Sequence, residues 1–78
     1  NTNTMKTIFA VHHVFDLLDY NEHQYFTSYD DAYDHFSEIV DELKRTGDIC
    51  EVYTELGDEF YVQFKNGAEK VYIQEINL

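Results

Sequence analysis

One amphipathic segment near the middle of the chain constrains the fold more than any other feature. From Ser28 to Gly47 the apolar residues recur at helical spacing and form a single stripe, made of Ala32, Phe36, Ile39, Val40 and Leu43. The Ser28 hydroxyl is placed to cap the backbone N–H of Asp31, and Gly47 is expected to end the helix in the left-handed conformation. A chain of 78 residues can build one small core and no second one. The stripe must therefore be buried by other segments of the same domain.

The other apolar segments have the composition of β-strands. Lys6–Asp16 is apolar on both alternating sets of positions, which predicts a strand that is central in its sheet or covered on both faces. We expect Leu17–His23 to be a connection with a turn at Asn21-Glu22, followed by a short strand at Gln24–Thr27. Three further strands are predicted after the helix, at Ile49–Leu56, Asp58–Lys65 and Ala68–Ile76.

Glycine-containing turns organise this C-terminal part as a meander. Gly57-Asp58 marks the first turn, and Asn66-Gly67 predicts a type I′ turn in which both residues have positive φ. Alternation then gives one inward apolar set, made of Cys50, Val52, Leu56, Phe60, Val62, Phe64, Val71 and Ile73. The predicted fold is α+β with order β(β)αβββ, a two-layer domain in which one helix packs on an antiparallel sheet of four to five strands. Residues 5–78 form this domain, and residues 1–4 are expected to be a disordered terminus or a remnant ahead of a natural Met5.

The charge balance excludes several classes of function. Asp and Glu number 16 against 5 Lys and Arg, which gives a formal net charge of −11. Direct binding of DNA or RNA, or of an anionic membrane, needs clustered cations and is not expected. The longest apolar run, Ile8–Val11, is too short to span a bilayer. The lone cysteine, Cys50, belongs to the apolar set and is expected to be an inert core thiol in the reducing environment of the cytoplasm.

The negative charge is concentrated in the first half of the chain. No Lys or Arg occurs from Thr7 to Leu43, whereas nine carboxylates do. On the predicted helix the pairs Asp30/Asp34, Asp34/Glu38 and Glu38/Glu42 are all spaced i, i+4, and each like-charge pair costs a few tenths of a kcal/mol. Because successive carboxylates rise by about 6 Å along the axis, their spacing approaches that of phosphates on one nucleic-acid strand.

Two explanations of this acidity remain open. The first is solubility, since net charge keeps small proteins dispersed. The second is mimicry of a nucleic acid, in which the acidic face docks into the basic groove of a nuclease or CRISPR effector. For that role the candidate residues are Asp19 and Glu22 in the preceding connection and Asp30, Asp34, Glu38, Asp41 and Glu42 on the helix.

The helix segment YDDAYDHFSEIVDEL and the meander ICEVYTELGDEFYVQFKNGAEKVYIQEI also carry a resemblance. In size, acidity and α+β pattern the chain resembles small phage-encoded inhibitor proteins of the nucleic-acid-mimic type, such as anti-CRISPR, anti-restriction and uracil-DNA glycosylase inhibitor proteins. The resemblance implies a stoichiometric, non-catalytic blocker of a nucleic-acid enzyme, which would serve evasion of host defence in the bacterial cytoplasm.

A second candidate surface is aromatic. Tyr53, Tyr61 and Tyr72 fall on the alternation set opposite the core, so they are expected to share the sheet face that the helix leaves open. Tyrosine is favoured at protein interfaces because it adds contact area at low entropic cost. The alternative function is therefore a small cytosolic adaptor or a homodimeric module that uses this face.

Metal and enzyme chemistry find little support in the sequence. His12 and His13 are adjacent on a predicted strand, so their side chains point to opposite faces and cannot chelate one ion together. Asp31, His35 and Glu38 share a helix face, but they lack a recognised metal signature even if His23 joins them. The chain also lacks a phosphate-binding glycine loop and an isolated acid–base pair. No catalytic residue, metal site or cofactor is predicted.

Overall fold

The computed structural model describes residues 6–15 and 20–78. Its elements follow the predicted order ββαβββ: β1 (Thr7–Phe15), β2 (Tyr20–Phe26), α1 (Tyr29–Thr46), β3 (Ile49–Leu56), β4 (Glu59–Phe64) and β5 (Gly67–Asn77). The expectations for residues 1–4 and for 17–19 concern parts of the chain outside these ranges.

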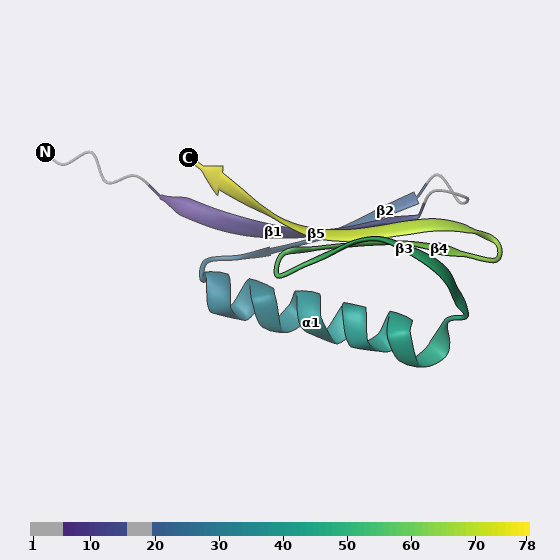
Figure 1. Ribbon diagram of the computed structural model, residues 1–78. Coiled ribbons are helices and arrows are strands. Elements are labelled where there is room, and N and C mark those ends of the chain that lie inside the picture. Colours follow the sequence, from purple (N-terminus) through teal and green to yellow (C-terminus); the bar gives the residue numbers. More distant parts are fainter. Residues whose placement is uncertain (1–5, 16–19) are drawn as a thin grey trace, which may run out of the picture.

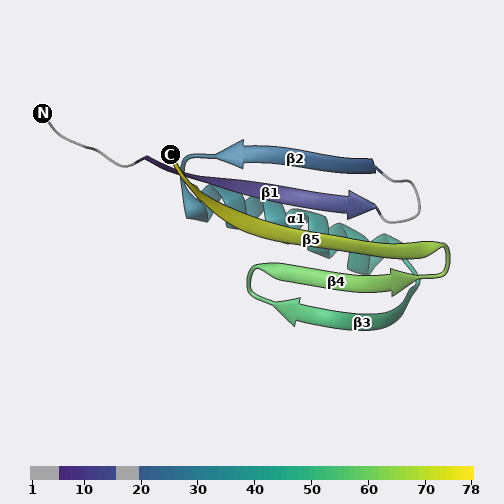
Figure 2. The same ribbon diagram turned by 90° about the horizontal axis from the view of Figure 1, so that it is seen from above.

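The five strands form one antiparallel sheet with α1 packed on one face, which confirms the predicted α+β architecture (Figure 1). The strand order is β2-β1-β5-β4-β3, so β1 lies inside the sheet, as its apolar composition predicts. Seen from above, α1 runs beneath β1 and β5, and β3 lies to one side of it (Figure 2). Among residues 6–15 and 20–78, no helix lies on the other face of the sheet.

The core forms where the apolar stripe of α1 meets β1, β4 and β5. Its buried members are Val11, Ala32, Phe36, Val40, Phe60, Val62 and Val71. Ile39 and Leu43 pack against this cluster from the edges of the stripe, as the helical spacing predicts. At the start of α1 the Ser28 Oγ accepts a hydrogen bond from the Asp31 backbone N–H at 3.2 Å, which confirms the predicted cap.

Strand β2 is longer than the sequence predicts. The expected turn at Asn21-Glu22 is wrong, because Asn21 pairs with Val14 and Glu22 with His13 inside the β1–β2 ladder. Residues 21–25 are all exposed on this edge strand. Main-chain pairing with β1 holds residues 21–25 in a strand, and none of their apolar side chains is buried. The alternation of polar and apolar residues therefore does not predict a strand there.

Strand β3 is the opposite edge, and its predicted alternation is only partly correct. Ile49 packs against the core, but Val52 and Leu56 are 46% and 63% exposed. Two register shifts against β4, between Ile49 and Glu51 and between Val52 and Thr54, act as β-bulges and interrupt the period of two. Cys50 is also exposed, so the predicted inert core thiol is wrong. Bulges and the lack of a covering helix together leave β3 largely in solvent.

Two glycines have roles that differ from the predicted ones. Gly47 has φ −99° and ψ 150°, so it ends α1 in an extended rather than a left-handed conformation. A Cβ there would lie 2.3 Å from Cε1 of Phe64, so this position needs glycine for close packing. Phe64 pairs with Gly67 across a loop of Lys65 and Asn66, so the type I′ turn at Asn66-Gly67 is wrong by one position; Gly67 keeps a positive φ of 143°. The Gly57-Asp58 turn is confirmed.

Candidate functional site

The carboxylates of α1 form one outward-facing stripe. Asp30, Asp34, Glu38, Asp41 and Glu42 are all exposed, whereas the buried residues of α1, such as Phe36, face the sheet. The helical period of 3.6 residues places these five side chains on the half of the helix away from the sheet. The structure thus brings together the helix residues that the sequence proposes for partner binding, and we call this set the acidic helix face.

Within the described residues, the ion pairs that Lys and Arg of α1 form lie at the C-terminal end of this face. Arg45 Nη2 lies 2.5 Å from Glu42 Oε1, and Lys44 turns toward β3, where its Nζ lies 2.6 Å from Glu55 Oε2. The hydrogen bond to Glu55 raises the pKa of Lys44 above its ordinary value. Desolvation opposes this increase, and the charges of Glu55 and Asp41 add to it.

The N-terminal and central parts of the face stay unneutralised. Across residues 6–15 and 20–78, Asp30, Asp34 and Glu38 have no Lys or Arg within ion-pair distance. Their mutual repulsion is therefore uncompensated within the described fold, and the field of this part of the helix is available to a partner.

Of the two carboxylates predicted in the connection before the helix, the structure describes Glu22 but not Asp19. Glu22 lies in β2 rather than in a loop, and it borders a hollow between β2 and α1 that is also lined by His35 and Ile39. Its Oε1 lies 3.9 Å from Nδ1 of the buried His13, whose Nε2 is 2.9 Å from Glu69 Oε1. Glu22 thus flanks the acidic helix face from the side, while Asp19 falls outside the described residues.

The three tyrosines lie together on the opposite side of the molecule, which matches the predicted sharing of one sheet face. The rings of Tyr53 and Tyr61 have their centroids 4.9 Å apart, and the Tyr53 hydroxyl donates to Gln63 Oε1 at 3.3 Å. Lys70 Nζ lies 5.9 Å from the Tyr61 centroid and 5.0 Å from that of Tyr72. Tyr53 is 48% exposed, and the other two rings are half-buried. We call this set the tyrosine sheet face.

The candidate residues therefore fall on two surfaces separated by the sheet. Helix α1 covers one side of the sheet and leaves the other side open (Figure 1). The acidic helix face lies on the outer side of α1, and the tyrosine sheet face lies on the open side of the strands. A single flat partner surface cannot contact both. The two candidate functions consequently depend on different residues and are separable by mutation.

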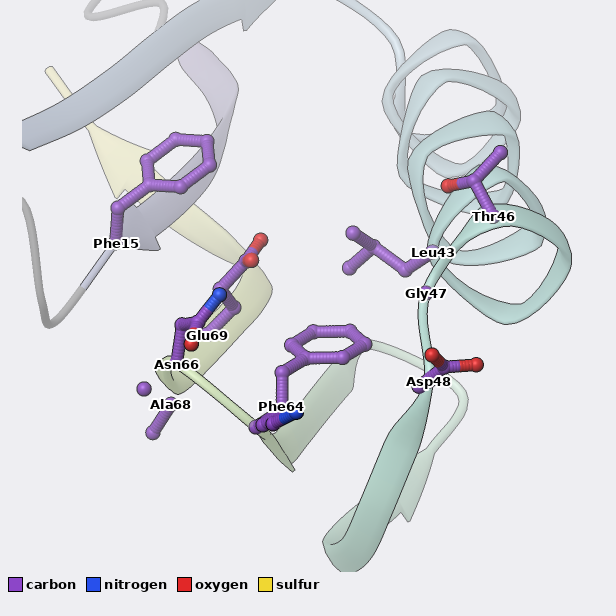
Figure 3. A pocket seen from close by; sticks show the side chains of 11 residues that line it. Phe15, Leu43, Thr46, Gly47, Asp48, Phe64, Asn66, Ala68 and Glu69 are labelled. Carbon is purple, nitrogen blue, oxygen red and sulfur yellow. The ribbon is translucent and has the colours of Figure 1, made fainter.

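A hollow of about 510 Å³ lies at the C-terminal end of α1 (Figure 3). Phe15, Leu43 and Phe64 point into it from three different elements, and Glu69 and Asp48 add carboxylates to its lining. Since Glu69 is engaged by His13, the lining offers no isolated acid–base pair of the kind that general acid–base catalysis needs.

Sequence reasoning missed the histidine contacts. His12 and His23 face each other across β1 and β2, and their pairing depends on a strand register that no spacing in the sequence specifies. The helix set of Asp31, His35 and Glu38 does not form a ligand cluster. Nowhere in the described ranges do three or more His, Cys, Asp or Glu side chains gather around a point where a metal ion could sit.

Comparison of the chain with protein-family models, with curated proteins and with solved structures finds no match. Within the described part of the chain, no helix combines the length and the apolar character needed to cross a membrane.

Proposed function

We propose that this protein is a non-catalytic inhibitor that uses its acidic helix face to occupy the basic groove of a nucleic-acid-processing enzyme, such as a CRISPR effector or a restriction or repair nuclease. The observation that carries the proposal is the row of Asp30, Asp34 and Glu38, which are exposed and lack a cationic neighbour in the described fold. The proposed place of action is the cytoplasm of a bacterial cell.

The chemistry of a nucleic-acid groove fits this row. Such grooves carry Lys and Arg that contact successive phosphates of a strand, and i, i+4 carboxylates on a helix repeat at about 6 Å, which is near the spacing of phosphates along one strand. Tyr33, 42% exposed at the edge of the same helix, offers a ring to guanidinium groups as well. Association would be accelerated by the opposite charges and weakened by salt.

A charge-reversal pair tests the proposal. The protein is immobilised on a resin and incubated with a bacterial lysate at about 50 mM and at about 500 mM salt. A basic nuclease or effector that is retained at low salt is then purified for affinity measurements. Asp34→Lys combined with Glu38→Lys should weaken binding at least tenfold, because two attractive contacts become repulsive. Asp58→Lys with Glu51→Lys is the matched control, since both residues are exposed and belong to the β3–β4 hairpin rather than to α1.

The control variant changes the net charge by the same amount, so it measures the general effect of charge. Circular dichroism should show that both variants fold, and the helix variant should be slightly more stable because the 30/34 and 38/42 pairs become attractive while the 34/38 pair stays like-charged. Full affinity and unchanged salt dependence of the helix variant would refute a role for the acidic helix face.

The alternative function is an adaptor or homodimeric module that binds through the tyrosine sheet face. The specific observation in its favour is that the rings of Tyr53 and Tyr61 are in contact, 4.9 Å apart and tilted by 47°, on a sheet face that no helix of the described fold covers. For this function, Tyr61→Ala should abolish partner binding or self-association measured by sedimentation, the Asp34 and Glu38 reversals should have no effect, and salt should matter little.

A further inference from the structure

Two histidines meet on the uncovered face of the sheet. His12 in β1 and His23 in β2 are direct cross-strand partners. Their Nδ1 atoms lie 2.6 Å apart, with ring centroids at 4.8 Å and ring planes at 80°. From the other neighbouring strand, β5, Gln74 places its Oε1 2.7 Å from Nε2 of His12. Three adjacent strands therefore hold this pair in position.

The hydrogen bonds define which nitrogen carries a proton. Gln74 Oε1 is an acceptor, so Nε2 of His12 must donate to it. In a neutral His12 ring the Nδ1 atom is then an acceptor, and the proton between the two rings belongs to Nδ1 of His23. Two imidazole nitrogens thus share a single proton at short range. When the His23 ring changes tautomer, so that its proton moves from Nδ1 to Nε2, both rings stay neutral and each offers an Nδ1 lone pair on the side that faces the other ring.

We propose that His12 and His23 chelate one divalent transition-metal ion through their Nδ1 atoms, with Gln74 as a positioning residue that fixes the His12 ring. Imidazole is a ligand for Cu²⁺, Ni²⁺ and Zn²⁺. A hydrogen bond from the second ring nitrogen to a protein oxygen, as Gln74 accepts here, is the usual support of a metal-bound histidine.

The separation of the nitrogens favours particular metals. With metal–nitrogen bonds of about 2.0–2.1 Å, two cis ligands at 90° lie about 2.9 Å apart, and two tetrahedral ligands about 3.3 Å apart. From the observed 2.6 Å, the rings need to open by about 0.3 Å for the first arrangement and about 0.7 Å for the second. Cu²⁺ and Ni²⁺, which accept square-planar or tetragonal geometry, therefore fit better than tetrahedral Zn²⁺.

Two side chains of β5 lie near the pair. The rings of Tyr72 and His12 have their centroids 4.8 Å apart and are tilted by 30°, and Lys70 Nζ lies 5.0 Å from the Tyr72 centroid. No third His, Cys, Asp or Glu joins the pair within residues 6–15 and 20–78, so water completes the coordination. The bound ion would join the edge strand β2 to β1 by a second link besides the main-chain ladder.

The other two histidines provide matched controls. His13 is buried on the helix side and bonded to Glu69, and His35 on α1 packs against the ring of Phe26. Both line the same hollow as His23, but in the described fold their rings contact those of Phe15 and Phe26 and not the rings of the His12–His23 pair. His35→Gln removes one imidazole from the chain and keeps both proposed ligands, and it is the control of choice because His35 is the more exposed of the two.

The test is a titration of the full chain with CuCl₂, NiCl₂ and ZnCl₂ by isothermal calorimetry. We expect one ion per chain, with affinity in the order Cu²⁺ > Ni²⁺ > Zn²⁺. His12→Gln and His23→Gln should each weaken binding at least tenfold, Gln74→Ala about tenfold, and His35→Gln should have no effect. The electron paramagnetic resonance spectrum of the Cu²⁺ complex should show two coordinated imidazoles, and one or none in the His23→Gln variant.

A thermal-shift measurement provides a readout that does not depend on affinity alone. Excess Ni²⁺ should raise the Tm of the wild type and of His35→Gln, and leave His23→Gln unchanged, because only a bound native state gains stability. Absence of binding at 100 µM free metal, or equal binding by His12→Gln and the wild type, would overturn the proposal. Since the acidic helix face has no part in this site, failure here leaves the proposed inhibitor function unaffected.

Discussion

Replacement of Gly47 by alanine should destabilise the protein although its backbone angles suit any residue. The position has φ −99° and ψ 150°, an ordinary extended conformation. The added Cβ would lie 2.3 Å from Cε1 of Phe64 and 2.9 Å from the carbonyl oxygen of Leu43, well inside the normal carbon–carbon contact of about 3.5–4.0 Å. The Phe64 ring must move by more than 1 Å, or the last turn of α1 must shift.

The magnitude follows from two opposing effects. Overpacking of a well-packed site costs about 1–3 kcal/mol, and the half-buried Phe64 ring can relax in part, which favours the lower half of that range. Replacement of glycine by alanine lowers the conformational entropy of the unfolded chain, which stabilises the folded state by about 0.4–1 kcal/mol. The net loss is then about 0–1.6 kcal/mol with its centre near 0.8 kcal/mol, and this central value corresponds to a Tm decrease of roughly 3–6 °C for a domain of this size.

Urea unfolding followed by circular dichroism measures this loss, and Gly57→Ala is the matched control. A Cβ at Gly57 meets nothing within 4 Å, and positive φ is found only at Gly67 among the glycines, so this variant should be as stable as the wild type or slightly more stable. Adding Phe64→Leu to Gly47→Ala should cost less than the sum of the two single changes, because the clashing ring edge is gone. Equal stability of Gly47→Ala and Gly57→Ala would refute the packing argument.

Three further changes test other parts of the structure. Ser28→Ala should cost about 1 kcal/mol in urea unfolding, since it removes the acceptor of the Asp31 N–H, and Ser28→Asp should restore most of it. Phe60→Ala, at a 1% exposed core position, should cost about 3–5 kcal/mol, while Leu56→Ala at the uncovered edge should stay within about 0.5 kcal/mol. Lys44 has a higher pKa in the folded state than in the unfolded state, where it is about 10.4, so its protonated form stabilises the fold. This contribution is complete below the unfolded pKa and is lost as the pH rises through the folded pKa. The stability difference between wild type and Lys44→Met should therefore shrink above about pH 10.4.

The sequence predicts the elements whose signals are local. The start of α1 depends on the Ser28 hydroxyl and its stripe on spacing alone, and both are confirmed. The bounds of β3 are also as predicted, because Gly47 and Gly57 flank a run rich in β-branched and aromatic residues. Layer order follows from these elements, since one helical stripe on a small domain has only the sheet to pack against.

What the sequence does not predict depends on pairing between distant strands. Exposed polar residues such as Asn21 become strand residues because β1 lies beside them, and Cys50 becomes exposed because bulges alter the pairing of β3. The acidic helix face needs only the helical period and is therefore predictable in its helix part. The contact between His12 and His23 needs the register of β1 against β2, which spacing along the chain does not contain.

The two edge strands of the sheet, β2 and β3, differ in a way that limits edge-to-edge association between molecules. The register of β2 against β1 is unbroken from Phe26 to Tyr20, whereas two irregularities interrupt β3. An edge strand with a regular register can pair with a strand of another molecule, whereas an edge strand with register shifts resists such pairing. Fibril growth requires strand addition at both edges of the sheet. Edge-to-edge association of this protein would therefore stop at the dimer, and concentrated solutions should contain dimers at most rather than filaments.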